Sequence, residues 1–244
     1  MVQEYSAYEN AAMEYDALMS TLELKVLSGV IDELAAFQGD TPISVIDFCC
    51  GTGLIAEMIN GRPGIDYVGI DMDADFLAAA RKKMRGRENF RFIESDVLTY
   101  RSEKPFDVAL ITFGYHHIED PCKEMFLKHV YGLLKHKGIC IVGDYIIPSY
   151  EEEQGYRAAN TEFYARRIAY LKKHGLVSAE YLESFKEFCA YSADHKEFKV
   201  DYRHFLELFE KTGFLKEKEI KTWPHDHTFN NDRVGDYIFV FRKK

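Results

Sequence analysis

The sequence has little positive charge, and its basic residues are scattered along the chain. Over 244 residues, 31 lysines and arginines stand against 40 aspartates and glutamates, which gives a formal net charge of −9. A protein that follows a phosphate backbone needs a basic face, and nothing in this sequence provides one. We therefore expect no nucleic-acid partner.

Long apolar runs are also missing. No stretch approaches the roughly 20 apolar residues that a membrane helix requires. The start, Met-Val-Gln-Glu-Tyr, has no basic region followed by an apolar core. We therefore expect a cytoplasmic protein with no membrane partner.

Cysteine is sparse and shows no metal-type spacing. The sequence has five, an odd number, mostly in apolar runs: Cys49, Cys50, Cys122, Cys140 and Cys189. They are typical of reduced, buried, intracellular thiols. Cys49 and Cys50 could be a redox pair, but adjacent cysteines seldom form an unstrained bridge.

The stretch from Ile43 to Gly53, I-S-V-I-D-F-C-C-G-T-G, is the most informative part of the chain. A β-branched run that ends in an acid and a glycine-containing turn predicts a buried parallel strand feeding a ligand loop. A helix is predicted to follow over residues 54–60. Gly51 and Gly53 let the backbone approach a ligand, and the helix start offers free N–H groups.

A second strand over residues 65–71 strengthens this interpretation, because two glycines alone are weak evidence. It ends at Asp71, about twenty residues past the glycines, where a strand-end carboxylate meets a ribose. A carboxylate there can accept hydrogen bonds from both ribose hydroxyls.

Residues 47–53, D-F-C-C-G-T-G, resemble the first motif, D-x-G-x-G-x-G, of the class I S-adenosylmethionine-dependent methyltransferases, and Gly-Ile-Asp71 resembles their second motif. The sequence departs from the motif at Cys49, where the family usually has its first glycine. The resemblance implies S-adenosyl-L-methionine as cofactor and an α/β, doubly wound, Rossmann-like fold. Its seven-stranded sheet is mostly parallel with an antiparallel last strand, and the fold adds N-terminal helices and a helical insertion after strand five.

The resemblance also implies which residues bind the cofactor. Asp96, at the end of a third strand predicted over residues 89–97, accepts from the adenine amino group while the next backbone N–H donates to the ring. The alternative is that Asp96 caps a turn. The implied cofactor-binding residues are Tyr15, Asp47, Cys49, Gly51, Gly53, Asp71, Met72, Asp96, Val97 and Phe113.

Residues 3–37 have apolar positions at helical spacing with a break near Ser20, which predicts two helices. The resemblance implies that residues 1–37 form a lid over the cofactor, with Tyr15 close to it. Plain packing on the sheet is the alternative for Tyr15.

A fourth strand over residues 106–112 is apolar on both faces and therefore central. Open sheets bind ligands just past the ends of such strands, and His116 and His117 follow there. Imidazole titrates near neutral pH, so either histidine could accept a substrate proton; packing against the loop is the alternative. A turn at residues 133–138 and a fifth strand over 139–148 bring Asp144 and Tyr145 to the same edge. We assign His116, His117 and Tyr145 to the catalytic, acceptor side.

Residues 149–199 are helical, charged and rich in tyrosine, which predicts an insertion that covers the substrate. Tyrosines can form an apolar wall and still offer hydroxyls, although most will be packing residues. Four basic residues could meet a substrate carboxylate or phosphate, or could simply be solvated: Arg157, Arg166, Arg167 and Lys186.

A helix over residues 200–212 and strands over 214–223 and 236–242 complete the chain. The resemblance implies that the last strand inserts antiparallel between the fifth and the sixth. His225 and His227, with His116 or His117, would suffice for a divalent metal, but such loop histidines are more often polar surface, so we assign no metal.

These features predict a single domain over residues 1–244 that transfers methyl groups in line to a small-molecule acceptor. The sequence is compatible with a homodimer. Three alternatives remain. A nicotinamide-dependent dehydrogenase would need a glycine where Ala56 stands, a cofactor-modifying enzyme similar to carboxy-S-adenosylmethionine synthases would share the layout of residues 202–214, and a non-catalytic binding module would keep only the fold.

Overall fold

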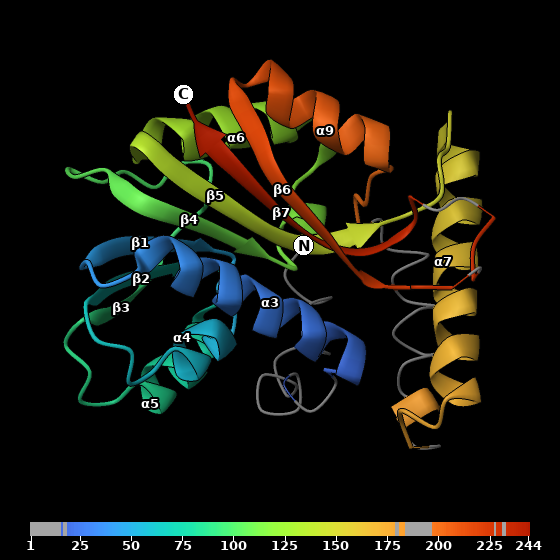
Figure 1. The fold of residues 1–244 in the computed structure, drawn as a ribbon, viewed down its shortest axis with the longest axis horizontal. Helices are drawn as coiled ribbons and strands as arrows, with labels where there is room; N and C mark the ends of the chain where they lie inside the picture. The colour runs from blue at the N-terminus through green and yellow to red at the C-terminus, as the bar shows by residue number, and fades with distance from the viewer. Residues whose placement is uncertain (1–15, 17–18, 179–180, 184–196, 227, 231–232) are drawn as a thin grey trace.

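The computed structural model describes residues 16, 19–178, 181–183, 197–226, 228–230 and 233–244 (Figure 1). At its centre is a seven-stranded sheet of order β3-β2-β1-β4-β5-β7-β6. The strands are β1 (Ile43–Phe48), β2 (Ile65–Asp71), β3 (Phe90–Glu94), β4 (Phe106–Thr112), β5 (Leu134–Ile146), β6 (Phe214–Trp223) and β7 (Gly235–Lys243).

The pairing is parallel from β3 through β5, while β7 runs antiparallel to both of its neighbours. This confirms the predicted mostly parallel sheet with an antiparallel last strand. The chain builds outward from β1 to β3, then returns to place β4 on the other side of β1. Ligands of open α/β sheets bind at such a reversal, beyond the strand ends.

Helices cover both faces of the sheet (Figure 1). One face carries α3 (Thr21–Gln38), α4 (Leu54–Met58) and α5 (Ala74–Lys83), and the other carries α6 (Asp120–Leu133) and α9 (Tyr202–Lys211). Strand β4 supplies both cores, because Val108 and Leu110 point to one face and Ala109 and Ile111 to the other. It is central, as its apolar sequence predicts.

Helix α3 begins where the sequence predicts a break. Ser20 caps it by accepting from the Leu22 N–H at 3.1 Å, and Glu23 accepts in return from the Ser20 N–H at 3.0 Å. This capping box satisfies donors that the helix start would otherwise leave open. Tyr15 and nearly all of the predicted first helix lie outside the described residues.

Two strand boundaries differ from the sequence prediction. Strand β3 ends at Glu94, so Asp96 lies in the turn beyond it. The predicted turn at residues 133–138 is wrong, because β5 starts at Leu134, which pairs with Phe106. The irregularity is absorbed locally: Lys137 adopts φ 63° and its carbonyl accepts from Arg242 at 2.7 Å.

The long helix α7 (Glu153–Lys173) lies beyond the ends of the central strands (Figure 1). Its inner face packs against aromatic residues of the chain's last third, including Trp223 and Phe229. Among the described residues, no helix is long and apolar enough to cross a membrane.

Candidate active site

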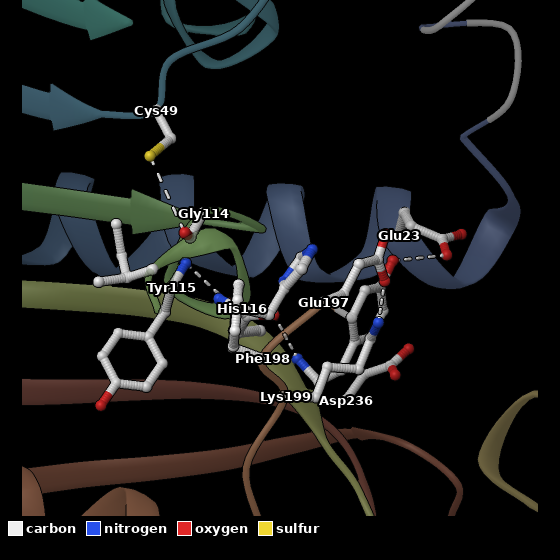
Figure 2. Close-up of polar contacts among 12 residues, drawn as sticks. Glu23, Cys49, Gly114, Tyr115, His116, Glu197, Phe198, Lys199 and Asp236 are labelled. Atoms are coloured by element: carbon white, nitrogen blue, oxygen red, sulfur yellow. Dashed lines mark hydrogen bonds and ion pairs between the residues drawn. The ribbon is translucent and has the colours of Figure 1, made fainter. Parts of the chain in front are cut away.

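Strained backbone marks the ends of β1 and β4. Cys49 has φ 57° and Phe113 has φ 51°, a left-handed conformation that residues with a side chain rarely adopt. The two ends approach closely: the Cys49 Sγ lies 3.8 Å from the Gly114 carbonyl oxygen (Figure 2). A Cβ at Gly114 would lie 2.8 Å from the Cys49 Cβ. Such strain concentrates at functional sites, because packing must hold it in place.

The glycine loop has the predicted conformation. Gly51 and Gly53 have φ 52° and 73°. A Cβ on Gly53 would meet the Ala80 Cβ at 2.8 Å, so only glycine lets the loop lie against α5. Asp71 holds the loop from β2 by accepting from the N–H groups of Gly51 at 2.8 Å and Asp73 at 3.0 Å. Burial raises the pKa of Asp71, although its backbone hydrogen bonds oppose the shift.

Asp47 lies beneath this loop. Its carboxylate is buried and accepts from the Tyr67 hydroxyl at 2.5 Å. Burial raises the pKa of Asp47 to about 7, although the bond from Tyr67 acts in the opposite direction. The structure thus binds this predicted cofactor ligand to Tyr67 of β2.

The other predicted cofactor residues divide by exposure. Val97 and Phe113 are buried, whereas Cys49, Asp96 and the 67%-exposed Met72 retain solvent contact. Asp96 also caps its turn, because its Oδ1 accepts from the Leu98 N–H at 2.7 Å. The turn-capping alternative is therefore present in the structure, which does not test the adenine contact.

Three polar residues absent from the predicted set join the glycine loop to the chain before α3. The Thr52 hydroxyl donates to Asp16 at 2.6 Å, and Lys83 of α5 forms an ion pair with the same carboxylate. Asp16 thereby ties the segment preceding α3 to the loop.

On the acceptor side, Asp144 of β5 organises the turn that follows β4. It accepts from the Tyr115 N–H at 3.0 Å and lies 2.7 Å from the His116 Nδ1. Burial opposes ionisation of Asp144, yet the charge and hydrogen bond of His116 hold its pKa below the usual value. The predicted convergence of these two strand ends is confirmed.

His117 lies beside this pair, with its ring centroid 4.2 Å from that of His116. The residue is exposed, but the protein around its ring desolvates it. That desolvation, together with the positive charge available to His116, lowers the pKa of His117. His117 is therefore neutral at neutral pH and a weaker proton acceptor than the sequence suggests.

Tyr145 faces the N-terminal helix. Its hydroxyl donates to the Glu23 carboxylate at 3.1 Å, and its ring centroid lies 5.4 Å from that of His116. Burial and the charge of Glu23 raise the pKa of Tyr145 well above its usual value. The hydroxyl therefore stays protonated as a hydrogen-bond donor.

A buried ionic cluster that the sequence did not reveal lies behind Tyr145. The Arg167 guanidinium donates to Glu23 at 2.6 Å and to both oxygens of Asp236 at 2.7 Å. Because the two carboxylates share one cation, their pKa values separate. Burial raises that of Asp236 to about 6 despite Arg167. At Glu23 burial acts in the same direction, but Arg167 and the hydrogen bonds from Ser20 and Tyr145 together outweigh it and lower the pKa. Only Arg167 carried a sequence signal, as one of four basic candidates in the insertion.

A second buried pair, Glu197 and Lys199, lies on the same side (Figure 2). The Lys199 Nζ is 4.9 Å from the Tyr164 ring centroid and 5.8 Å from that of Tyr145.

No group of three histidine, cysteine, aspartate or glutamate side chains is placed to bind a metal within the described part of the chain. His227 lies outside that part, so the metal suggestion involving it stays untested.

Comparisons with known proteins agree with this geometry. A family model described as a methyltransferase domain matches residues 45–138, which span the glycine loop, Asp71, Asp96 and both histidines. Demethylmenaquinone methyltransferase of Lactococcus lactis is 25% identical over 218 residues, covering 85% of this chain and 80% of that protein. Trans-aconitate 2-methyltransferase of Rhizobium etli is 36% identical over 76 residues, which cover 31% of this chain and 28% of that protein. Together these comparisons support the class I S-adenosylmethionine-dependent methyltransferase family.

Solved structures support the fold of this methyltransferase. The TehB-like S-adenosylmethionine-dependent methyltransferase from Corynebacterium glutamicum matches with a TM-score of 0.61 at 16% identity, over 98% of this chain and 99% of that chain. The N-methyltransferase NodS from Bradyrhizobium japonicum, in complex with S-adenosyl-L-homocysteine, matches with a TM-score of 0.56 at 11% identity, over 92% and 88% of the two chains. At such low identity these matches show the fold alone. The family model and the named relatives identify S-adenosylmethionine as the cofactor.

Proposed function

We propose that this methyltransferase acts on a small-molecule acceptor by in-line transfer, with His116 as the proton acceptor. The hydrogen bond between the His116 Nδ1 and Asp144 is the observation that carries the proposal. Relatives whose names specify small acceptors, demethylmenaquinone and trans-aconitate, support the substrate class.

The residues around the glycine loop fit the cofactor. Gly51 has a positive φ, and among the described residues a Cβ there would meet only the Phe76 ring, at 3.8 Å. Asp71 lies at the rim with a half-buried carboxylate that suits ribose hydroxyls. Asp96 and Val97 would face the adenine, and Met72, Cys49 and Phe113 would line the same side. Asp47 would act from below by holding the loop.

His116 and Asp144 would handle the proton. When bound, S-adenosylmethionine would supply the methyl group to the acceptor's lone pair, and the electrons of the carbon–sulfur bond would remain on sulfur. The His116 Nε2 takes the acceptor's proton, since Asp144 fixes the Nδ1–H and stabilises the imidazolium. His117 and Tyr145 would position the acceptor, because one is a weak base and the other is a protonated donor.

We also propose that residues 1–244 form one domain, in which the segment before residue 38 covers the cofactor and residues 149–199 cover the acceptor. The contact of Asp16 with Thr52 supports the first cover, and the reach of Arg167 to Glu23 supports the second. The acidic net charge supports a protein that works without nucleic acid, and the free cysteines among the described residues support the cytoplasm. A homodimer is compatible with all of these features.

The experiment pairs calorimetric titration of S-adenosylmethionine with an assay of S-adenosylhomocysteine release. Asp71→Ala should weaken cofactor binding by about 2 to 4 kcal/mol, because it removes charge-assisted hydrogen bonds. His116→Ala should slow turnover and leave cofactor affinity nearly intact, and the exposed control Asp75→Ala should change neither. Unchanged affinity in Asp71→Ala would remove Asp71 from the site, and equal loss of both quantities in His116→Ala would make His116 a loop residue.

Product analysis separates the alternatives. Mass spectrometry of the reaction should find a methylated acceptor and S-adenosylhomocysteine. A modified S-adenosylmethionine would instead indicate the cofactor-modifying reaction, and binding without any turnover would indicate a binding module. A dehydrogenase finds no support in the named relatives, which are methyltransferases.

A further inference from the structure

The inner face of α7 carries a repeating set of polar residues. Tyr156, Asn160, Tyr164 and Arg167 follow at intervals of four, four and three, and all are buried. Residues at this spacing share one face of a helix. Tyr156 donates to the Glu197 carbonyl and Tyr164 to its carboxylate, the latter at 3.2 Å. Asn160 therefore lies between two side chains that both reach the Glu197–Lys199 pair.

Asn160 has no hydrogen-bond partner within the described part of the molecule. Its side chain is 0% exposed, and neither its Oδ1 nor its Nδ2 is satisfied. Buried amides are almost always bonded, because water no longer compensates them. The Arg167 Nε and the Trp223 Nε1 are also unsatisfied in the surrounding aromatic cluster, and the guanidinium carbon lies 5.1 Å from the Trp223 ring centroid.

The neighbouring charges, by contrast, are paired. Arg167 binds Glu23 and Asp236, and Lys199 binds Glu197. A charged ligand group entering here would have to break one of these buried pairs, which is strongly unfavourable. The unsatisfied donors and acceptors suit an uncharged ligand. The main one is the side-chain amide of Asn160, which has one acceptor atom and two donor hydrogens.

The position of Asn160 relates it to the proposed reaction centre. One turn along α7, the Phe163 ring centroid lies 5.7 Å from that of Tyr145, and the Tyr145 ring lies 5.4 Å from that of His116. Aromatic rings of Phe163, Trp223 and Phe229 surround the same region. These rings favour a planar, apolar ligand body.

We propose that Asn160 determines acceptor specificity by binding an uncharged donor–acceptor group, a carboxamide or lactam, on a planar acceptor. The placement of the acceptor beside α7 rests on the proposed function. The amide edge of such a group offers one donor and one acceptor, which match the Oδ1 and Nδ2 of Asn160. Carboxylates, phosphates and ammonium groups match neither this edge nor the paired charges around it.

The first test measures which ligands bind. Benzamide, 2-pyridone, benzoate and benzylamine are titrated by ligand-observed NMR, with and without S-adenosylhomocysteine, into wild type, Asn160→Leu and the control Thr161→Ala. Leucine matches asparagine in shape, and Thr161 is the exposed neighbour on α7. Wild type and Thr161→Ala should bind benzamide and 2-pyridone about tenfold or more tightly than the two ions, and Asn160→Leu should lose that preference. Equal binding of all four probes to wild type, or an unchanged preference in Asn160→Leu, overturns the proposal.

The second test measures thermal unfolding without ligand. Asn160→Leu should unfold at the same or a higher temperature than wild type, because it removes polar atoms that have no partner. A lower midpoint, or a variant that does not fold, would mean that the amide is structurally bonded, and would overturn the proposal. Titration of S-adenosylhomocysteine alone reports separately on the proposed function. If wild type does not bind S-adenosylhomocysteine but still prefers the amide probes, the proposed methyl transfer is wrong and the proposed Asn160 site is supported.

Discussion

Cys49 occupies a backbone conformation that suits glycine, with φ 57° at the end of β1. A left-handed conformation costs a residue with a side chain roughly 1–2 kcal/mol. The neighbouring Cys50 has no such strain, and its thiol fills the space above Gly69, where a Cβ would lie 2.7 Å from the sulfur. We therefore expect replacement by glycine to have different effects on stability at the two adjacent cysteines.

Cys49→Gly should change the free energy of unfolding by less than about 1 kcal/mol, because relief of strain offsets the entropy of the new glycine. Cys50→Gly should cost about 2 kcal/mol or more, because it also removes a buried group. Urea denaturation of both variants measures the difference. Equal losses would show that the conformation of Cys49 stores no strain.

Asp47 should make the protein less stable as the pH rises. Burial raises its pKa in the folded state to about 7 from 3.8, so between these values the folded protein holds a proton that the unfolded chain has released. Stability therefore falls from about pH 4 to pH 7 and is level above that. Asp47→Asn keeps an acceptor for Tyr67 and cannot ionise. It should be more stable than wild type at pH 7.5 by on the order of 1–3 kcal/mol, and the gain should shrink toward pH 4.5.

Denaturation midpoints at several pH values measure this effect. The exposed Asp40→Asn should follow the wild-type profile throughout. If wild type and Asp47→Asn show parallel profiles, Asp47 is ionised in the folded protein and the assigned shift is wrong.

At the scale of elements, α3 lies unusually close to the sheet. A Cβ at Gly143 of β5 would lie 2.6 Å from the Val26 Cγ1 and 3.0 Å from the Val30 Cγ2. Gly143→Ala should therefore destabilise the protein by about 1–3 kcal/mol through overpacking. Gly132→Ala in α6 is the matched change, because no atom of the described residues lies within 4 Å of its Cβ position. It should stabilise the helix by about 0.5–1 kcal/mol. Thermal unfolding should move in opposite directions for the two variants, and a loss in both would contradict the close packing of α3.

The elements also show where sequence patterns succeed. Apolar runs that end in an acid predicted β1 and β2. The continuous apolar sequence of β4 predicted its central position, because a strand that is buried on both faces of a parallel sheet is apolar at consecutive positions. The start of β5 was missed, since Lys135, His136 and Lys137 are exposed and polar. Their extended backbone depends on pairing with β4 and on a hydrogen bond from Arg242, neither of which is local.

At the scale of the whole molecule, Arg167 connects three distant parts of the chain. It joins α7 to Glu23 at the start of α3 and to Asp236 of β7, and its side chain is fully buried. Arg167→Met should cost about 3–5 kcal/mol of unfolding free energy, because it leaves two buried carboxylates without their cation. Arg157→Met is the control, since Arg157 is exposed on the same helix and its replacement should change the unfolding free energy by less than about 0.5 kcal/mol. Chemical denaturation measures both. Similar losses would mean that the cluster does not hold these elements together.

The sequence by itself located β1, β2 and β4, the acids Asp47 and Asp71, the glycine loop and the two histidines, because each is encoded within one short segment. The tertiary structure alone decided which of these groups act together. Asp144 contacts the His116 ring rather than that of His117, and the Tyr67 hydroxyl donates to Asp47. Arg167 donates to Glu23, which lies 144 positions earlier in the chain. Such pairings have no local pattern: they exist because burial removes water from these charges and leaves them only one another as partners.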